Sequence, residues 1–276
     1  MDLLNIFREI EKIDPEVYNR LDSRRNAMKQ FTNLSGKIAL TALPFALGSM
    51  LNKAYGQATG TDVKSVLSLA LTLEYLEAAY YSTALAKPGL IPASGTGAIT
   101  TISKHETAHV KFLQNALAGM GGFPPSPTFD FTAKGTFPTV FSDYDYFLAV
   151  SQAFEDTGVR AYKGQAPNLA GAGTVLTAAL SIHSVEARHA AHIRQMRKTR
   201  GTLGATASLK PWITGKQSGI ATTATDPVYA GEEVTVQAGV NIAAINNMGA
   251  DSASESFDEP LTGPQAVAIA SLFIKA

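Results

Sequence analysis

Two Glu–Tyr pairs recur in this chain at the same spacing, and a Glu-x-x-His motif follows each pair. Glu74 and Glu155 each have a tyrosine seven residues further on, at Tyr81 and Tyr162. The motifs begin 32 residues after the first glutamate and 31 residues after the second. A four-helix bundle can hold two metal ions with one Glu from each of two helices and a Glu-x-x-His from each of the other two. The repeat therefore predicts a two-metal site with the ligands Glu74, Glu106, His109, Glu155, Glu186 and His189.

The surroundings of the two motifs favour a buried site over a solvated polar face. Around Glu106 and Glu186, the positions three, four and seven residues away are mostly apolar or histidine. A carboxylate buried on such a face is costly unless it is paired or binds a metal. Four carboxylates would offset two divalent cations, and imidazole with carboxylate suits iron or manganese. We expect two iron ions, with two manganese ions as the alternative.

Four helices must position these residues. The spacing of apolar residues predicts helices near 61–86, 95–118, 142–165 and 173–200, with Ser142 as an N-cap and Gly201 beyond the last helix. The paired glutamates lie 17 and 15 residues from a first loop centred near residue 91, and 14 and 17 residues from a second near 169. Antiparallel helices rise equally from their loop at about 1.5 Å per residue, so the four glutamates should meet at one level.

Residues 119–141 are too long for an ordinary hairpin loop and are rich in Gly and Pro, but they could cross the length of a bundle. The predicted fold class is all-α: a four-helix bundle over 59–200, with a long crossover between helices two and three. Residues 201–276 form a mostly irregular C-terminal tail, which we expect to pack on the bundle. Within the tail, 234–236 suggest a short strand and 263–273 a short helix.

Residues 1–58 have the order of an export signal. Arg24 and Arg25 precede a mildly apolar run over 38–51, and small residues precede a possible cleavage site after Ala58. The run is too short and too interrupted for a comfortable membrane span. We expect an exported bacterial protein, periplasmic or in the cell envelope, with no stable membrane span after processing. The alternative is an N-terminal arm with an amphipathic helix that stays attached.

Composition excludes several classes of function. Hydrophobic residues make up 45% and charged residues 17% of the chain, which is typical of a globular protein. A net charge of zero provides no general attraction to nucleic acid. The absence of cysteine excludes disulfides, thiolate zinc sites, thiol catalysis and cysteine-ligated iron–sulfur centres. The sequence leaves both a monomer and a homo-oligomer open.

Four residues near the predicted ligands have open roles. Glu77, three positions after Glu74, could be a seventh ligand or a gate for ions, but we favour a helix-edge carboxylate. His183 and His192 could extend the coordination or shuttle protons, although such histidines more often support ligands or lie at the surface. His105 is adjacent to a predicted ligand in sequence and should therefore point elsewhere.

Tyr81, Tyr162 and Asp156 also have more than one interpretation. The tyrosines could donate hydrogen bonds to ligand carboxylates or relay electrons, or they could simply pack in the core. Asp156 could orient a ligand histidine or be an exposed helix charge.

Residues 61–200 resemble the ferritin-like superfamily, which includes bacterioferritins, rubrerythrins and manganese catalases. The stretch 73–81, Leu-Glu-Tyr-Leu-Glu-Ala-Ala-Tyr-Tyr, is similar to bacterial ferritin-like domain proteins and to the plant desiccation-related group. Residues 257–261 extend this resemblance weakly into the tail. The resemblance implies the ferritin-like topology and the same six ligands, with Glu106 and Glu186 bridging the two ions.

The resemblance also implies a function. A di-metal protein of this kind would react with oxygen or peroxide, as a ferroxidase, a peroxide scavenger or a manganese-catalase-like enzyme. The absence of cysteine removes the rubredoxin-like electron partner that rubrerythrins carry. The alternative is a non-catalytic, stress-protective envelope protein, which the desiccation-related resemblance supports.

Overall fold

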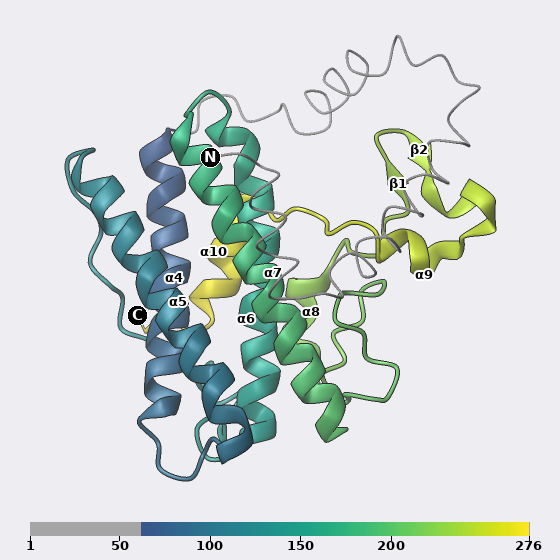
Figure 1. Cartoon of the computed structure of the whole chain (residues 1–276), viewed down its shortest axis with the longest axis horizontal. Coiled ribbons are helices and arrows are strands. Elements are labelled where there is room, and N and C mark those ends of the chain that lie inside the picture. The colour runs from purple at the N-terminus through teal and green to yellow at the C-terminus, as the bar shows by residue number, and fades with distance from the viewer. Residues whose placement is uncertain (1–61, 276) are drawn as a thin grey trace, which may run out of the picture. The chain divides into compact units, whose positions relative to one another are not determined.

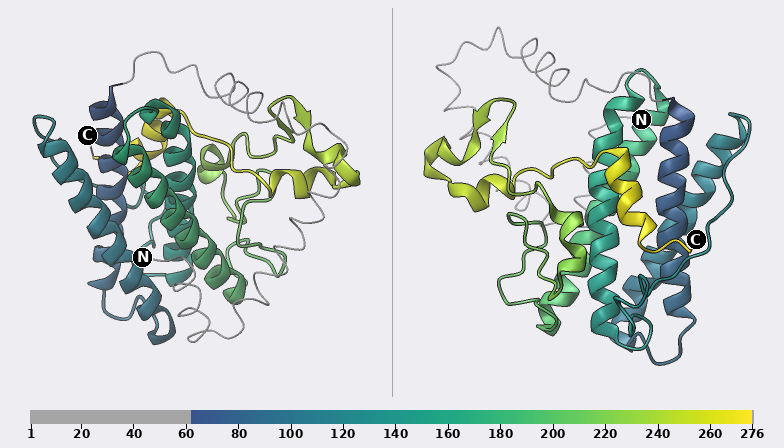
Figure 2. Two further views of the ribbon diagram at one scale, coloured as in Figure 1. Left: turned by 45° about the horizontal axis from the view of Figure 1, so that its top comes forward. Right: turned by 180° about the vertical axis from the view of Figure 1, so that it is seen from behind.

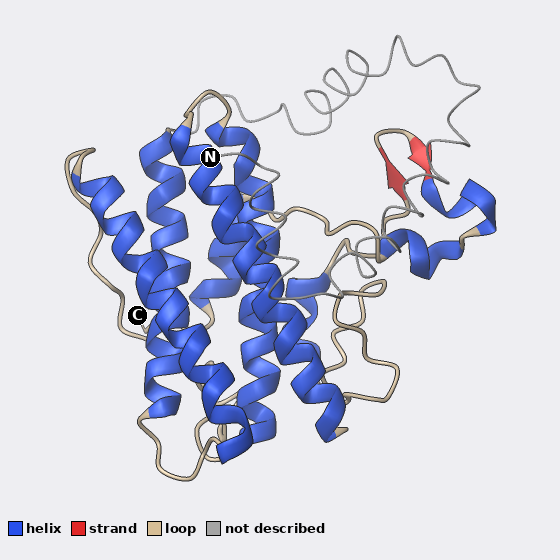
Figure 3. Cartoon of the chain, viewed as in Figure 1, coloured by secondary structure: helices blue, strands red, loops and turns tan. Residues whose placement is uncertain are grey.

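The computed structural model describes residues 62–275, so the leader predicted over 1–58 lies outside the described residues. Four long helices dominate it: α4 (Val63–Leu85), α5 (Ala93–Ala118), α6 (Tyr144–Gln165) and α7 (Thr174–Arg200) (Figure 1, Figure 3). Each helix end lies within two residues of its predicted position. The helix α4 packs along α5 and α6 along α7, while α4 also contacts α6. The all-α prediction is therefore confirmed.

Capping residues set the ends of the second hairpin. The side chain of Asp143 accepts hydrogen bonds from the backbone N–H groups of Asp145 and Tyr146, so Asp143 is the N-cap of α6. The prediction of Ser142 as N-cap was wrong by one residue, because the Asp143 carboxylate satisfies two free N–H groups and adds negative charge at the positive end of the helix. The helix α7 ends at Arg200, and Gly201 lies beyond it as predicted, as a C-cap with a left-handed φ of 67°.

The segment between α5 and α6, residues 119–143, contains no helix. It returns along the bundle, so that α6 begins at the same end as α5 (Figure 1, Figure 2). The C-terminal residues hold this segment in place. Asp130 N donates to Phe273 O at 2.7 Å, Lys275 N donates to Thr128 O at 2.9 Å, and the rings of Phe137 and Phe273 stack.

Residues 201–275 are mostly irregular and contain only short elements. One further short element lies outside this range: the one-turn helix η1 (Ala166–Leu169) follows α6 directly, in the loop before α7. The strands β1 and β2 pair antiparallel, with Val236 opposite Asn241. The predicted strand over 234–236 is thus displaced, and only Val236 belongs to it. The elements are η2 (Thr223–Thr225), α8 (Asp226–Tyr229), β1 (Val236–Gln237), β2 (Val240–Asn241), η3 (Ile242–Asn247), α9 (Gly249–Ser254) and α10 (Gly263–Ser271).

Buried arginines connect this C-terminal segment to the bundle. Arg160 of α6 donates to Glu259 O at 2.7 Å and to Ala230 O at 2.9 Å, and it pairs with the Glu232 carboxylate at 2.7 Å. Arg197 of α7 donates in the same way to carbonyls of the 201–219 region. Irregular chain exposes many carbonyl groups, and buried guanidinium groups with several donors satisfy them.

The bundle core consists of two apolar clusters at different levels along the helices. One cluster includes Leu71 and Leu113, and the other includes Leu76, Phe147 and Ile193. The predicted metal ligands occupy the helix positions between these clusters. No helix within residues 62–275 combines the length and apolar character that a membrane crossing requires.

Candidate metal centre

All six predicted ligands meet inside the bundle, and each of the four long helices contributes to the group. The four glutamates are completely buried, and the two histidines are mostly buried. Their donor atoms form two groups, each with all members within 4.8 Å of one another. Glu106 and Glu186 belong to both groups. The groups are Glu74, Glu106, His109 and Glu186, and Glu106, Glu155, Glu186 and His189.

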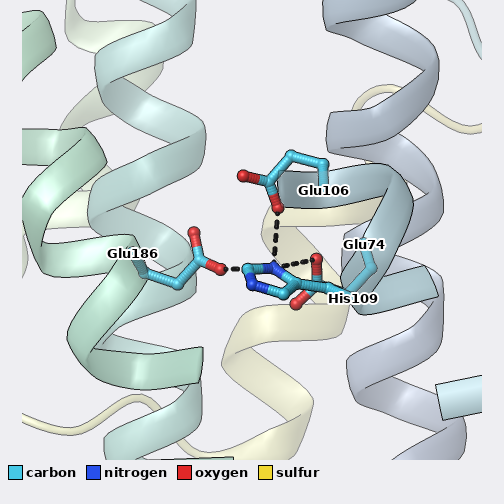
Figure 4. Close-up of side chains that lie close together, drawn as sticks. All are labelled: Glu74, Glu106, His109 and Glu186. Carbon is cyan, nitrogen blue, oxygen red and sulfur yellow. Dashed lines mark hydrogen bonds and ion pairs between the residues drawn. The ribbon is translucent and has the colours of Figure 1, made fainter. Parts of the chain in front are cut away.

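The first group gathers three carboxylates around one imidazole nitrogen (Figure 4). His109 Nδ1 lies 3.2 Å from Glu74 Oε2 and 3.1 Å from Glu106 Oε2. The same nitrogen lies 3.2 Å from Glu186 Oε1, on the opposite side of the bundle. One nitrogen and three oxygens from three helices thus converge on a single point.

The second group repeats this arrangement with the other histidine. His189 Nδ1 lies 2.8 Å from Glu106 Oε1, 3.2 Å from Glu155 Oε2 and 3.7 Å from Glu186 Oε2. Each group therefore has one imidazole, one carboxylate of its own and the two shared carboxylates. The internal repeat of the sequence reappears as two matching sets of donors side by side.

The two tyrosines cross between the halves of the repeat. Tyr81 donates a hydrogen bond to Glu155, and Tyr162 donates one to Glu74 Oε1 at 2.5 Å. Each tyrosine thus contacts the leading glutamate of the other half. Of the roles left open by the sequence, hydrogen bonding to a carboxylate of the cluster is the one for which the contacts are present.

Glu77 is buried, with 3% of its surface exposed, so the helix-edge interpretation was wrong. The equivalent position in the second half, three residues after Glu155, is Gly158. A Cβ atom on Gly158 would lie 3.4 Å from both Glu77 Oε1 and Glu186 Cγ. The extra carboxylate therefore lies directly beside this glycine, at the distance of an ordinary contact for a Cβ. Burial, and then the charge of Glu186, raise the pKa of Glu77 well above its ordinary value.

His105 contacts the cluster, which its sequence position did not suggest. Its Nδ1 lies 2.9 Å from Nε2 of His189, and the two rings stack with centroids 5.2 Å apart. The expectation that His105 points elsewhere was wrong, because it reaches the outer nitrogen of a histidine on α7. The only available signal was general: a histidine in a metal site usually needs a partner for its second nitrogen.

The other neighbouring residues lie outside the cluster. His192 is exposed, and His183 is half-buried, with no hydrogen bond to its Nδ1 from any described residue. Asp156 is 3% exposed and accepts hydrogen bonds from Arg194 and, at 2.7 Å, from Tyr229. It is therefore neither an exposed charge nor a support for a ligand histidine, because its carboxylate is part of the junction with the C-terminal segment.

Proximity shifts the pKa values within the cluster in opposite directions. Burial raises the pKa of Glu74 well above its ordinary value and that of Glu155 to about 8. Burial acts in the same sense on Glu106, but its contacts with His109 and His189 lower its pKa to about 2. Burial lowers the histidine pKa values, yet the surrounding carboxylates raise both to about 12. The cluster thus attracts positive charge strongly, in the form of protons or of metal ions.

Unpaired polar atoms test whether this cluster suits metal ions. Glu106 Oε1, Glu155 Oε2, both oxygens of Glu186 and Nδ1 of His189 are buried without a hydrogen-bond partner among residues 62–275. His189 Nδ1 and Glu106 Oε1 are 2.8 Å apart, but they are not aligned for a hydrogen bond, so this contact is ionic attraction. Buried polar atoms without partners are rare in proteins.

The distances between the donor atoms also match those expected around a bound metal ion. Two donors each about 2.1 Å from one octahedral cation lie about 3 Å apart. The contacts of His189 Nδ1 range from 2.8 to 3.7 Å, which is close to that separation. The residues therefore fit a pair of divalent cations that prefer oxygen and imidazole nitrogen, such as iron or manganese.

Comparison with known proteins gives one match. A family model described as a ferritin-like domain matches residues 61–199, which is about half of the chain and covers the four long helices almost completely. Comparisons with curated proteins and with solved structures gave no match.

Proposed function

Because this chain belongs to the ferritin-like domain family, we propose that its buried cluster binds two metal ions, most simply iron, and reacts with oxygen or peroxide. The observation that supports this proposal best is the sharing of Glu106 and Glu186 between two matching donor groups. A cluster built only for stability would not need two equivalent sets of donors around two shared carboxylates. Two ions held by these two groups would use the four carboxylate oxygens of the cluster that lack a hydrogen-bond partner.

When bound, two ferrous ions supply two electrons, which with two protons convert dioxygen to hydrogen peroxide, or hydrogen peroxide to two water molecules. The protein supplies the surroundings of that reaction. Tyr81 and Tyr162 orient the two carboxylates that belong to one group only. The two apolar clusters above and below the site limit the access of bulk water. A manganese pair in the same residues would favour catalase-like disproportionation of peroxide.

The test of the site is metal content. Full-length protein loaded anaerobically with Fe(II) should contain close to two ions per chain by elemental analysis. The variant Glu106→Gln/Glu186→Gln keeps the side-chain volume, but it removes the charge of both shared carboxylates, and it should lose most of the metal. Glu233→Gln, at an exposed glutamate of the C-terminal segment, is the matched control and should bind as the parent does. Equal metal content in all three proteins would refute the proposal.

The test of the activity is consumption of oxygen or peroxide by the loaded protein. We expect the parent to consume one of these oxidants, while the double variant does not. A protein with its full complement of metal and no turnover, with either iron or manganese, would support the alternative of a non-catalytic protein in which the ions only stabilise the bundle.

A further inference from the structure

A second internal feature lies one helical turn from the cluster. It is a cavity between the four long helices, toward the end where α4 begins and α5 ends. Ala70, Leu113 and Ile182 line it, and each stands four positions from a glutamate or histidine of the cluster on its own helix, which places both on one helix face. Tyr162 also lines it and donates a hydrogen bond to Glu74. This tyrosine therefore contacts both the cavity and a carboxylate of the cluster.

The wall of the cavity is apolar. Twelve of its fourteen lining residues have hydrocarbon side chains, and the others are Tyr162 and Gln165. Both polar side chains already have partners, because Tyr162 bonds to Glu74 and Gln165 accepts a hydrogen bond from Asn168 at 2.9 Å. The space open to the centre of a water-sized molecule is about 20 Å³. This is enough for one very small guest.

The wall chemistry selects among the small molecules relevant to this site. Water or hydrogen peroxide would lose hydrogen bonds in such a cavity and find none in exchange, whereas dioxygen would lose none. Apolar cavities in proteins stay dry and take up apolar guests such as xenon. A cavity of this kind next to a redox site therefore favours one oxidant over the other.

The exposure of the lining residues suggests how a guest enters. Phe112 at the rim is 43% exposed, and Leu69 and Val175 are partly buried, whereas Leu73 and Tyr162 at the inner end are buried. The cavity thus leads from the bundle surface toward the cluster. An apolar solute can follow this path without passing a charged side chain among the lining residues.

We propose that this cavity holds dioxygen beside the metal centre, so that oxygen rather than hydrogen peroxide is the oxidant. The inference rests on the proposed function, since it names the substrate of that same site. Its binding component can nevertheless be tested without any metal.

Xenon is the probe for the binding component. Full-length, metal-free protein under xenon pressure should bind xenon between α4, α5, α6 and α7, as seen by xenon NMR and by crystallography. Ala179→Leu places a larger side chain in the cavity and should abolish this binding. Ala224→Leu is the matched control, because Ala224 lines a separate apolar cavity beside Phe154 and Phe273, and it should leave the first xenon in place.

If Ala179→Leu fails to fold, Val175→Phe at the partly exposed rim closes the entrance with less disturbance of the core. Absence of xenon from this cavity in the parent protein would overturn the proposal, whether or not the protein binds metal.

The reactivity component needs the iron-loaded protein. Ala179→Leu should keep the parent's metal content and oxidise Fe(II) several-fold more slowly with oxygen, while its rate with hydrogen peroxide stays close to that of the parent. An unchanged rate with oxygen would overturn the role of the cavity. A parent protein that binds xenon but no metal would refute the proposed function, and with it the role in oxidation, while the cavity itself would stand.

Discussion

At the scale of single residues, the site depends on hydroxyl groups that hold its carboxylates. Tyr162 reaches Glu74 and Tyr81 reaches Glu155, so each half of the repeat orients a carboxylate of the other half. A carboxylate held in this way loses little freedom when it binds a cation. Glu77 departs from the internal symmetry, because the equivalent position in the second half is Gly158, which lies beside it.

We predict that Tyr162→Phe weakens metal affinity by roughly 10–100-fold, as is typical when a group supporting a ligand is removed. The matched control is Tyr80→Phe. Tyr80 is also buried and donates to Phe147 O at 2.8 Å, but it does not contact the cluster. Both variants should lose about 1 kcal/mol of stability, the usual net value of one hydrogen bond. Titration with metal and thermal unfolding separate the two effects, and equal metal affinities would contradict the orienting role.

At the scale of elements, the C-terminal segment depends on close approach to α6. A Cβ atom on Gly164 would lie 1.8 Å from Leu261 O, while Leu261 N donates to Arg160 O at 3.0 Å. The backbone before α10 therefore crosses α6 at a position where only glycine fits. The capping box of Thr262 and Gln265 then starts α10 directly after this crossing.

Gly164→Ala should destabilise the protein by about 1–3 kcal/mol, because overpacking against a backbone carbonyl outweighs the gain in helix propensity. It should also make residues 201–275 more sensitive to limited proteolysis. Gly97→Ala is the control within α5, since a Cβ there meets nothing within 4 Å. That change should stabilise by about 1 kcal/mol through helix propensity alone. Similar melting temperatures for the two variants would show that the backbone of Leu261 does not pack tightly against Gly164.

At the scale of the whole molecule, the buried cluster makes stability depend on pH. The histidine pKa values rise from 6.5 to about 12, so their contribution to stability is complete below pH 6.5 and is lost as the pH rises toward 12. The pKa of Glu155 rises from 4.5 to about 8, so its ionisation also costs stability between those values. The pKa of Glu106 falls to about 2, which matters only below pH 4.5.

The metal-free protein should therefore unfold at progressively lower temperature as the pH rises from 5 to 10. Glu155→Gln should flatten the part of this curve between about pH 5 and 8, because it removes the ionisation of one buried carboxylate. Bound divalent ions replace the protons and should raise the melting temperature at neutral pH. Calorimetry across this pH range checks each expectation, and stability that rises with pH in the metal-free protein would contradict the charge arrangement.

The sequence by itself determined the four long helices and the six side chains that share one level. Helix period and helix rise depend only on positions along the chain, so apolar spacing and distance from a loop are enough. Those rules do not state which helices become neighbours or how each is rotated. Only the tertiary structure decided that Tyr81 and Tyr162 cross between the halves and that His105 reaches His189. The burial of Glu77 was decided in the same way, because it depends on the helices that pack around it, including α6 at Gly158.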